Sequence, residues 1–124
     1  MSDEKILNKG LEFALEFGVN WLQPIQERLS KQFPYLKTTD LNNYDKICRA
    51  AMKAGHAYIY KMLGSAAEKK KKIKQSDLAI DLKSFLHNTY PWIDDSNLKS
   101  IYSQGCYYAY KDGLDQSIFN EDLK

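Results

Sequence analysis

Arg49 and His56 are the two side chains whose types and spacing fit a chemical reaction. An α-helix turns by about 100° per residue, so a separation of seven positions returns both residues to nearly the same helical face. A guanidinium group binds phosphate oxygens, and an imidazole ring transfers protons near neutral pH. The pair therefore indicates one catalytic hypothesis, which is the cleavage of RNA.

The Arg-x6-His spacing resembles the motif of the HEPN-domain ribonucleases, which are small helical bundles. The resemblance covers only these two positions, and Ala50 stands where a polar residue more commonly follows the arginine. It implies an RNA-cleaving bundle that uses Arg49 and His56 in a dimer. The alternative, which we favour, is structural: Arg49 pairs with Asp45 one turn earlier, and the His56 ring packs near a helix crossing.

The sequence predicts neither a cofactor nor a metal site. Cys48 and Cys106 have no Cys or His partner at ligand spacing, and two cysteines are too few for a secreted disulfide scaffold. The six glycines are scattered, so no phosphate-binding loop is formed. The chain starts with acidic residues and has no apolar run near the roughly 20 residues of a membrane span, so we expect a cytoplasmic protein without a membrane partner.

The net charge of +2 comes from one short lysine run. Residues 68–74 contain five lysines and one glutamate, which gives +4 locally and leaves −2 for the rest of the chain. No aromatic residue interrupts the run to stack on bases, and the chain has only two arginines. We therefore interpret the run as a solvated loop or helix end, and expect no nucleic-acid partner.

The spacing of apolar residues predicts an all-α fold. Apolar residues recur at intervals of three and four along the 124 residues, and no stretch alternates with a period of two. A chain of this length buries enough surface for a core without disulfides or metals. We expect one domain over residues 1–124, a compact bundle of five to six helices.

Two sequence matches indicate an internal duplication. Residues 29–36 match residues 86–93 at an offset of 57, with the order aromatic-Pro-aromatic-aliphatic in both, and Gly55-x-x-Tyr-x-Tyr-Lys recurs at Gly105 at an offset of 50. Glycine inside a helix predicts that the two long helices approach closely at these points. The predicted layout is an extra N-terminal helix (1–19), a first hairpin (20–64), a lysine-rich junction (65–75), a second hairpin (76–112) and a docking tail that forms a short C-terminal helix (113–124).

Aromatic residues concentrate in the second hairpin, and tyrosine and tryptophan are common anchors of protein interfaces. The alternative interpretation is that these rings complete the core or the docking site of the tail. The predicted partner-binding residues are Tyr90, Trp92, Asp94, Asp95, Tyr107 and Tyr110.

A separate line of apolar residues in the N-terminal segment predicts a homodimer through Phe13, Phe17 and Trp21.

The sequence therefore favours a non-enzymatic protein-binding module, such as an inhibitor, an adaptor or a toxin-neutralising immunity protein, with another protein as partner. The HEPN-like ribonuclease is the alternative. A third hypothesis is a small-molecule pocket between the two hairpins, lined by Tyr58, Tyr60, Tyr108 and Tyr110.

Overall fold

The computed structural model describes residues 4–16, 25–69, 72–113 and 118–119. Within these ranges the predicted all-α fold is confirmed, and the only strands are two residues long. The elements are α1 (Glu4–Ala14), α2 (Gln26–Gln32), α3 (Thr38–Glu68), β1 (Ile73–Lys74), α4 (Gln75–Thr89), α5 (Asp95–Lys111) and β2 (Ile118–Phe119).

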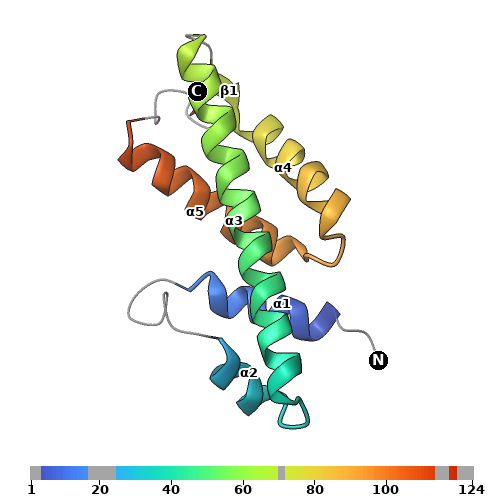
Figure 1. The fold of residues 1–124 in the computed structure, drawn as a ribbon. Coiled ribbons are helices and arrows are strands. Elements are labelled where there is room, and N and C mark those ends of the chain that lie inside the picture. The colour runs from blue at the N-terminus through green and yellow to red at the C-terminus, as the bar shows by residue number, and fades with distance from the viewer. Residues whose placement is uncertain (1–3, 17–24, 70–71, 114–117, 120–124) are drawn as a thin grey trace.

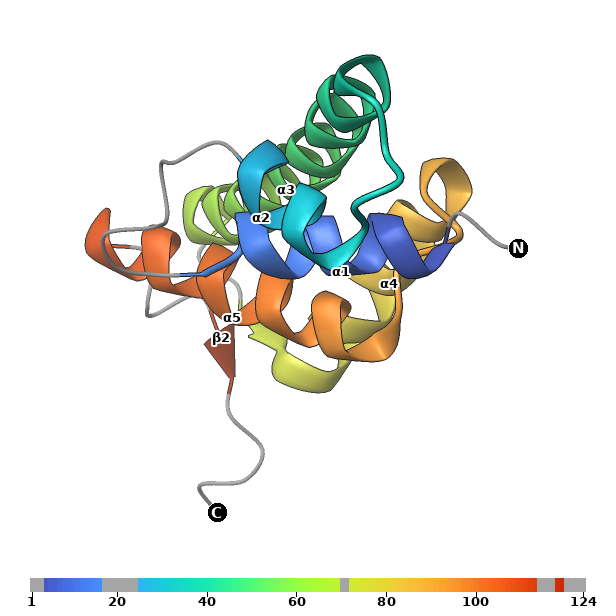
Figure 2. The same ribbon diagram turned by 90° about the horizontal axis from the view of Figure 1, so that it is seen from below.

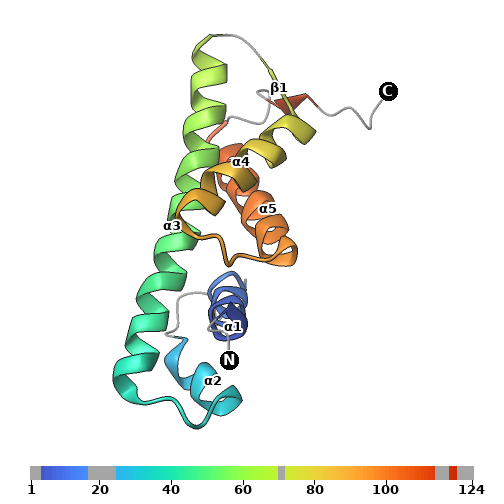
Figure 3. The ribbon, with the colours of Figure 1, turned by 90° about the vertical axis from the view of Figure 1, so that its right-hand side faces the viewer.

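Helix α3 is the central element of the fold. It is 31 residues long, and the other four helices lie on one side of it (Figures 1 and 3). Viewed along α3, α1 and α5 lie side by side on that face (Figure 2). The first hairpin was predicted over residues 20–64, with Gly64 as a helix cap and residues 66–74 either prolonging the helix or forming a linker. In the structure α3 continues through Gly64 to Glu68. The left-handed backbone conformation that favours glycine as a helix terminator occurs instead at Gly113, directly after α5, where φ is 87°.

Both ends of the predicted layout need correction. The N-terminal helix was expected over residues 1–19, but α1 ends at Ala14. The tail was expected to form a helix, but its described residues form β2, which pairs in parallel with β1. The reason for the second difference is the extended backbone before α4, which offers hydrogen-bonding groups to a neighbouring strand.

The aromatic-Pro-aromatic turns at the two hairpins have the same geometry. The backbone angles are φ −132° and ψ 74° at Phe33, and φ −126° and ψ 66° at Tyr90. In each turn the two aromatic rings meet edge to face, with centroids 6.3 Å apart at Phe33–Tyr35 and 6.2 Å apart at Tyr90–Trp92, and both ring pairs have an interplanar angle of 78°. The repeat seen in the sequence at these turns therefore extends to the backbone and to the ring packing.

The predicted close approach of α3 and α5 is also confirmed. A Cβ atom on Gly55 would clash with the Cγ2 atom of Ile101, and one on Gly105 would lie 2.8 Å from the Cδ1 atom of Ile59. Both isoleucines are fully buried. Each helix therefore inserts an isoleucine into the space that the glycine of the other helix leaves open.

The two glycines are not equivalent positions of the repeat, however. Helices α3 and α5 begin at corresponding residues after their turns, which aligns Gly105 with Cys48 rather than with Gly55. The counterpart of Gly55 is Gly10 in α1. A Cβ atom on Gly10 would lie 3.4 Å from the Cδ1 atom of Leu29, and one on Gly55 would lie 3.4 Å from the Cδ1 atom of Leu86, the matching residue of the second hairpin.

The fold therefore consists of two overlapping three-helix units, α1-α2-α3 and α3-α4-α5. In each unit, a glycine of the first helix packs against the buried leucine of the second. The N-terminal half of α3 is the third helix of the first unit, and its C-terminal half is the first helix of the second unit. Because α3 belongs to both units, it is longer than the other helices. Helix α1, predicted as an addition to the two hairpins, packs against α2 through Gly10 in the way that α3 packs against α4 through Gly55.

We predict that Gly55→Ala destabilises the fold, because the added methyl group must displace the buried Ile101. Overpacking of this kind typically costs 1–3 kcal/mol in the free energy of unfolding. Gly64→Ala is the matched control in the same helix, since a Cβ atom there meets nothing within 4 Å. It should stabilise the protein by up to about 1 kcal/mol through helix propensity. Urea unfolding of both variants measures the difference, and equal stabilities would contradict the close packing.

Candidate functional site

Arg49 takes part in the ion pair that the structural interpretation predicts. Its Nε atom donates to the Asp45 Oδ1 atom at 3.0 Å, one turn earlier on α3, and both side chains are about four-fifths buried. The predicted pairing is confirmed. A guanidinium group engaged in this way is a poorer ligand for phosphate than a solvated one, because Asp45 neutralises its charge.

His56 lies against α5, near the crossing of α3 and α5. Its ring meets the Tyr108 ring edge to face, with centroids 5.4 Å apart. The His56 Nε2 atom is buried and has no hydrogen-bond partner among the described residues. Burial lowers the pKa of His56, and the neighbouring Gln104 side chain partly opposes this effect. The geometry is that of a neutral, packed histidine, whereas proton transfer requires a nitrogen atom within reach of a substrate.

Gln104 connects this buried region to the end of α1. The Gln104 side chain is 3% exposed, and its Nε2 atom donates a hydrogen bond to the carbonyl oxygen of Leu15. Leu15 directly follows α1, and the last carbonyl groups of a helix lack partners within the helix. Gln104 therefore satisfies a carbonyl group at the end of α1, and it holds α1 beside α5.

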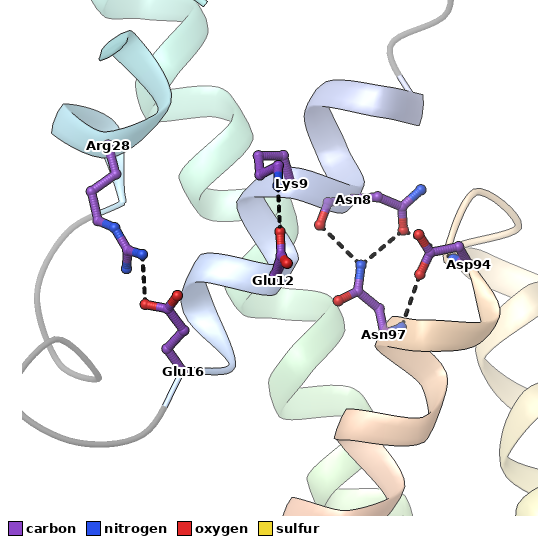
Figure 4. A network of polar contacts seen from close by, with 7 residues as sticks. All are labelled: Asn8, Lys9, Glu12, Glu16, Arg28, Asp94 and Asn97. Carbon is purple, nitrogen blue, oxygen red and sulfur yellow. Dashed lines mark hydrogen bonds and ion pairs between the residues drawn. The ribbon is translucent and has the colours of Figure 1, made fainter. Parts of the chain in front are cut away.

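A second polar contact holds α1 and α5 together two helical turns earlier (Figure 4). The Asn97 Nδ2 atom donates to the main-chain oxygen of Asn8 at 2.9 Å and to its Oδ1 atom at 3.0 Å. The Asn8 Nδ2 atom donates to the carbonyl oxygen of Trp92 at 2.8 Å, and Asp94 caps α5 by accepting from the Asn97 main-chain N–H at 2.8 Å. The sequence reading missed Asn8, Asn97 and Gln104. Two amide side chains seven residues apart on α5, among apolar neighbours, were the available signal.

The six predicted partner-binding residues separate into two groups. Tyr90 and Trp92 are partly buried in the turn, Asp94 is the cap of α5, and Asp95 pairs with Lys83 at 3.4 Å. Tyr107 and Tyr110 lie at the other end of α5, 12 or more residues away. At 1.5 Å per residue this separation is about 18 Å, so the six residues do not form one cluster.

Tyr107 and Tyr110 are the most exposed of the four aromatic residues in this set, with 50% and 41% of their surface accessible. Being three residues apart, they share the outward face of α5, whereas Gly105 and Ala109 face inward and are buried. The Tyr107 ring meets the Tyr108 ring edge to face at 5.6 Å, and the Lys111 Nζ atom lies 5.6 Å from its centroid. These contacts orient an aromatic side chain at the surface.

Phe13, predicted at a dimer interface, is covered by its own chain. Its side chain is 9% exposed, and the Arg28 guanidinium lies 4.0 Å from its ring centroid. Arg28 is held there by an ion pair with Glu16 at 2.6 Å (Figure 4). Phe17 and Trp21 lie outside the described residues, so the homodimer remains a prediction that Phe13 does not support.

The four tyrosines predicted to line a pocket between the hairpins make separate contacts. Tyr58 stacks on Phe85 with centroids 4.4 Å apart, and the Tyr60 hydroxyl donates to Asp112 at 2.7 Å. Tyr108 contacts His56, and Tyr110 faces outward. The described residues contain no cluster of three or more His, Cys, Asp or Glu side chains that could hold a metal ion. No described helix is long and apolar enough to cross a membrane.

Comparisons with known proteins add no further information about this site. No protein-family model, no curated protein and no solved structure matches the chain. The interpretation of the site therefore rests on its geometry.

We predict that His56 makes the stability of the fold depend on pH. Because burial lowers the pKa of His56 below its unfolded value near 6.5, the folded state favours the neutral ring. The stabilising contribution is complete above about pH 6.5 and is lost as the pH falls below it. Urea unfolding at pH 7.5 and at pH 5 should show a larger loss for the wild type than for His56→Gln, whose side chain does not titrate.

The matched control for this measurement is His87→Gln, which replaces the second of the two histidines of the chain. His87→Gln retains His56 and should keep the pH dependence that His56 contributes. If His56→Gln loses as much stability between pH 7.5 and pH 5 as the wild type does, the buried His56 ring is not the source of the pH dependence.

Proposed function

We propose that this protein is a non-enzymatic protein-binding module, such as an inhibitor, an adaptor or an immunity protein. The supporting observation is the pair of exposed tyrosines, Tyr107 and Tyr110, on the outward face of α5. Tyrosine gives a large contact area at a small cost in side-chain entropy, which makes it a frequent anchor of protein interfaces.

The rigidity of α5 also supports this proposal. Its inner face is tied down by the crossing at Gly105 and by the buried amides of Asn97 and Gln104. A binding surface on a helix that buried contacts hold in place loses little entropy when the partner docks.

The remaining predicted residues can belong to the same interface. A stable interface covers about 800 Å² on each partner, a patch about 30 Å across. Such a patch extends from Tyr107 and Tyr110 to Asp94 and Asp95 at the start of α5, about 18 Å away along the helix. The two acidic residues then lie at the rim, where they favour a partner with basic residues at the matching edge.

The ribonuclease alternative gains nothing from the geometry. Arg49 is paired with Asp45, and the ring nitrogen of His56 is buried against α5.

The proposal predicts that a photo-crosslinking amino acid at position 107 or 110 captures one protein in the native host. The matched control is position 35, because Tyr35 is 59% exposed in the turn of the first hairpin, where no partner is expected. Mass spectrometry of the adducts identifies the partner. The same adducts at position 35, or none at positions 107 and 110, would count against this surface.

Binding to the purified partner then gives the energetic test. Replacing both tyrosines, in Tyr107→Ser/Tyr110→Ser, should weaken the affinity by about 30-fold or more, since an interface anchor contributes roughly 2 kcal/mol. Tyr35→Ser should bind as the wild type does. Thermal unfolding confirms that all variants remain folded, as expected for exposed positions. An unchanged affinity of the double variant would refute the proposal.

A further inference from the structure

A groove with a volume of about 420 Å³ lies between α4 and α5, apart from the exposed tyrosines. Its walls include the apolar side chains of Ala79 and Leu82 from α4 and of Leu98 from α5, and the ring of Tyr102. Small-molecule sites typically have volumes of 300–1,000 Å³, mostly apolar walls and a few polar groups. The groove has these properties, and it lies within the second hairpin rather than between the two hairpins.

Two polar contacts bridge the helices at opposite ends of this set of lining residues. At one end the Tyr102 hydroxyl donates to the carbonyl oxygen of Gln75 at 3.4 Å, and burial raises the pKa of Tyr102. At the other end the Lys83 Nζ atom pairs with the Asp95 Oδ1 atom at 3.4 Å. Gln75 and Lys83 are eight residues apart on α4, so the groove is about 12 Å long.

The charged groups that line the groove carry a net positive charge. Lys83 and Lys99 provide two ammonium groups, and Asp95 provides one carboxylate. The ion pair of Lys83 with Asp95 is long, and its side chains are 54% and 89% exposed, so it is easily exchanged for another anion. Lys99 makes no hydrogen bond or ion pair with another described residue. The ammonium groups therefore complement an anion beside an apolar surface.

We propose that this groove binds a small amphipathic carboxylate, that is, an unbranched apolar chain with one carboxylate group. The chain lies along Ala79, Leu98 and the Tyr102 ring, and the carboxylate accepts hydrogen bonds from Lys83 and Lys99. The groove lies apart from Tyr107 and Tyr110 and shares only Asp95 with the rim of the proposed protein interface, and neither proposal depends on the other.

Titration of the full-length protein with sodium decanoate below its micelle concentration tests this site. Isothermal calorimetry should show saturable binding at one site. Decyltrimethylammonium, which has the same chain and the opposite charge, should bind at least tenfold more weakly. Absence of saturable decanoate binding, or equal affinity for both amphiphiles, would overturn the proposal.

Removing a positive charge and removing a negative charge in the groove should change the affinity for decanoate in opposite directions. A general effect on the fold would weaken binding in both variants. Lys99→Gln should weaken decanoate binding by about tenfold, which corresponds to about 1.4 kcal/mol. Asp95→Asn should strengthen it, because it removes a negative charge and releases Lys83. Ala79→Trp should abolish it by filling the groove. All three positions are exposed, so circular dichroism should show the wild-type fold.

Two variants outside the groove complete the experiment. Lys53→Gln removes an exposed lysine of α3, and Tyr107→Ser removes an anchor of the proposed protein surface. Both should bind decanoate with wild-type affinity. If Lys53→Gln weakens binding as much as Lys99→Gln does, or if Asp95→Asn and Lys99→Gln change the affinity in the same direction, the groove is not the carboxylate site.

Discussion

The rest of the structure depends on the close contact between α3 and α5. At this contact Ile101 occupies the space above Gly55, and Ile59 occupies the space above Gly105. Interiors packed at this density leave no room for an added methyl group, so the two glycines set the distance between the helices. The proposed functional surfaces are both on α5, since the exposed tyrosines project from it and the groove is formed between it and α4.

Two three-helix units overlap on one long helix, α3. In each unit, the first helix packs against the hairpin that follows it at a glycine. This helix is α1 in the first unit and α3 in the second. In addition, α1 lies against α5, where Asn97 and Gln104 contact its backbone. Buried amides that must be paired fix the register of the two helices, because any slip leaves them without partners. The outward face of α5 and its side towards α4 then remain for ligands.

The two proposed sites use different physical properties of the same helix. The tyrosine surface offers broad contact area on a helix whose position is fixed, which suits a folded protein. The groove offers a narrow apolar wall with two ammonium groups, which suits a small anion. The lysines of the groove lie outside the run at residues 68–74, so the charge of that run and the charge at this site are separate features.

The amino-acid sequence by itself determined the local features. Periodic apolar residues specify the helices, the aromatic-Pro-aromatic segments specify both turns, the glycines predict the helix crossing, and the spacing of Asp45 and Arg49 predicts their ion pair. Apart from the crossing, each of these features depends on neighbours along one helix or one turn. Only the tertiary structure decided that Gly10 is the counterpart of Gly55, that His56 and Gln104 are buried together, and that a groove lies between α4 and α5. These features depend on distances between helices, which are set by long-range packing that helical periodicity does not encode.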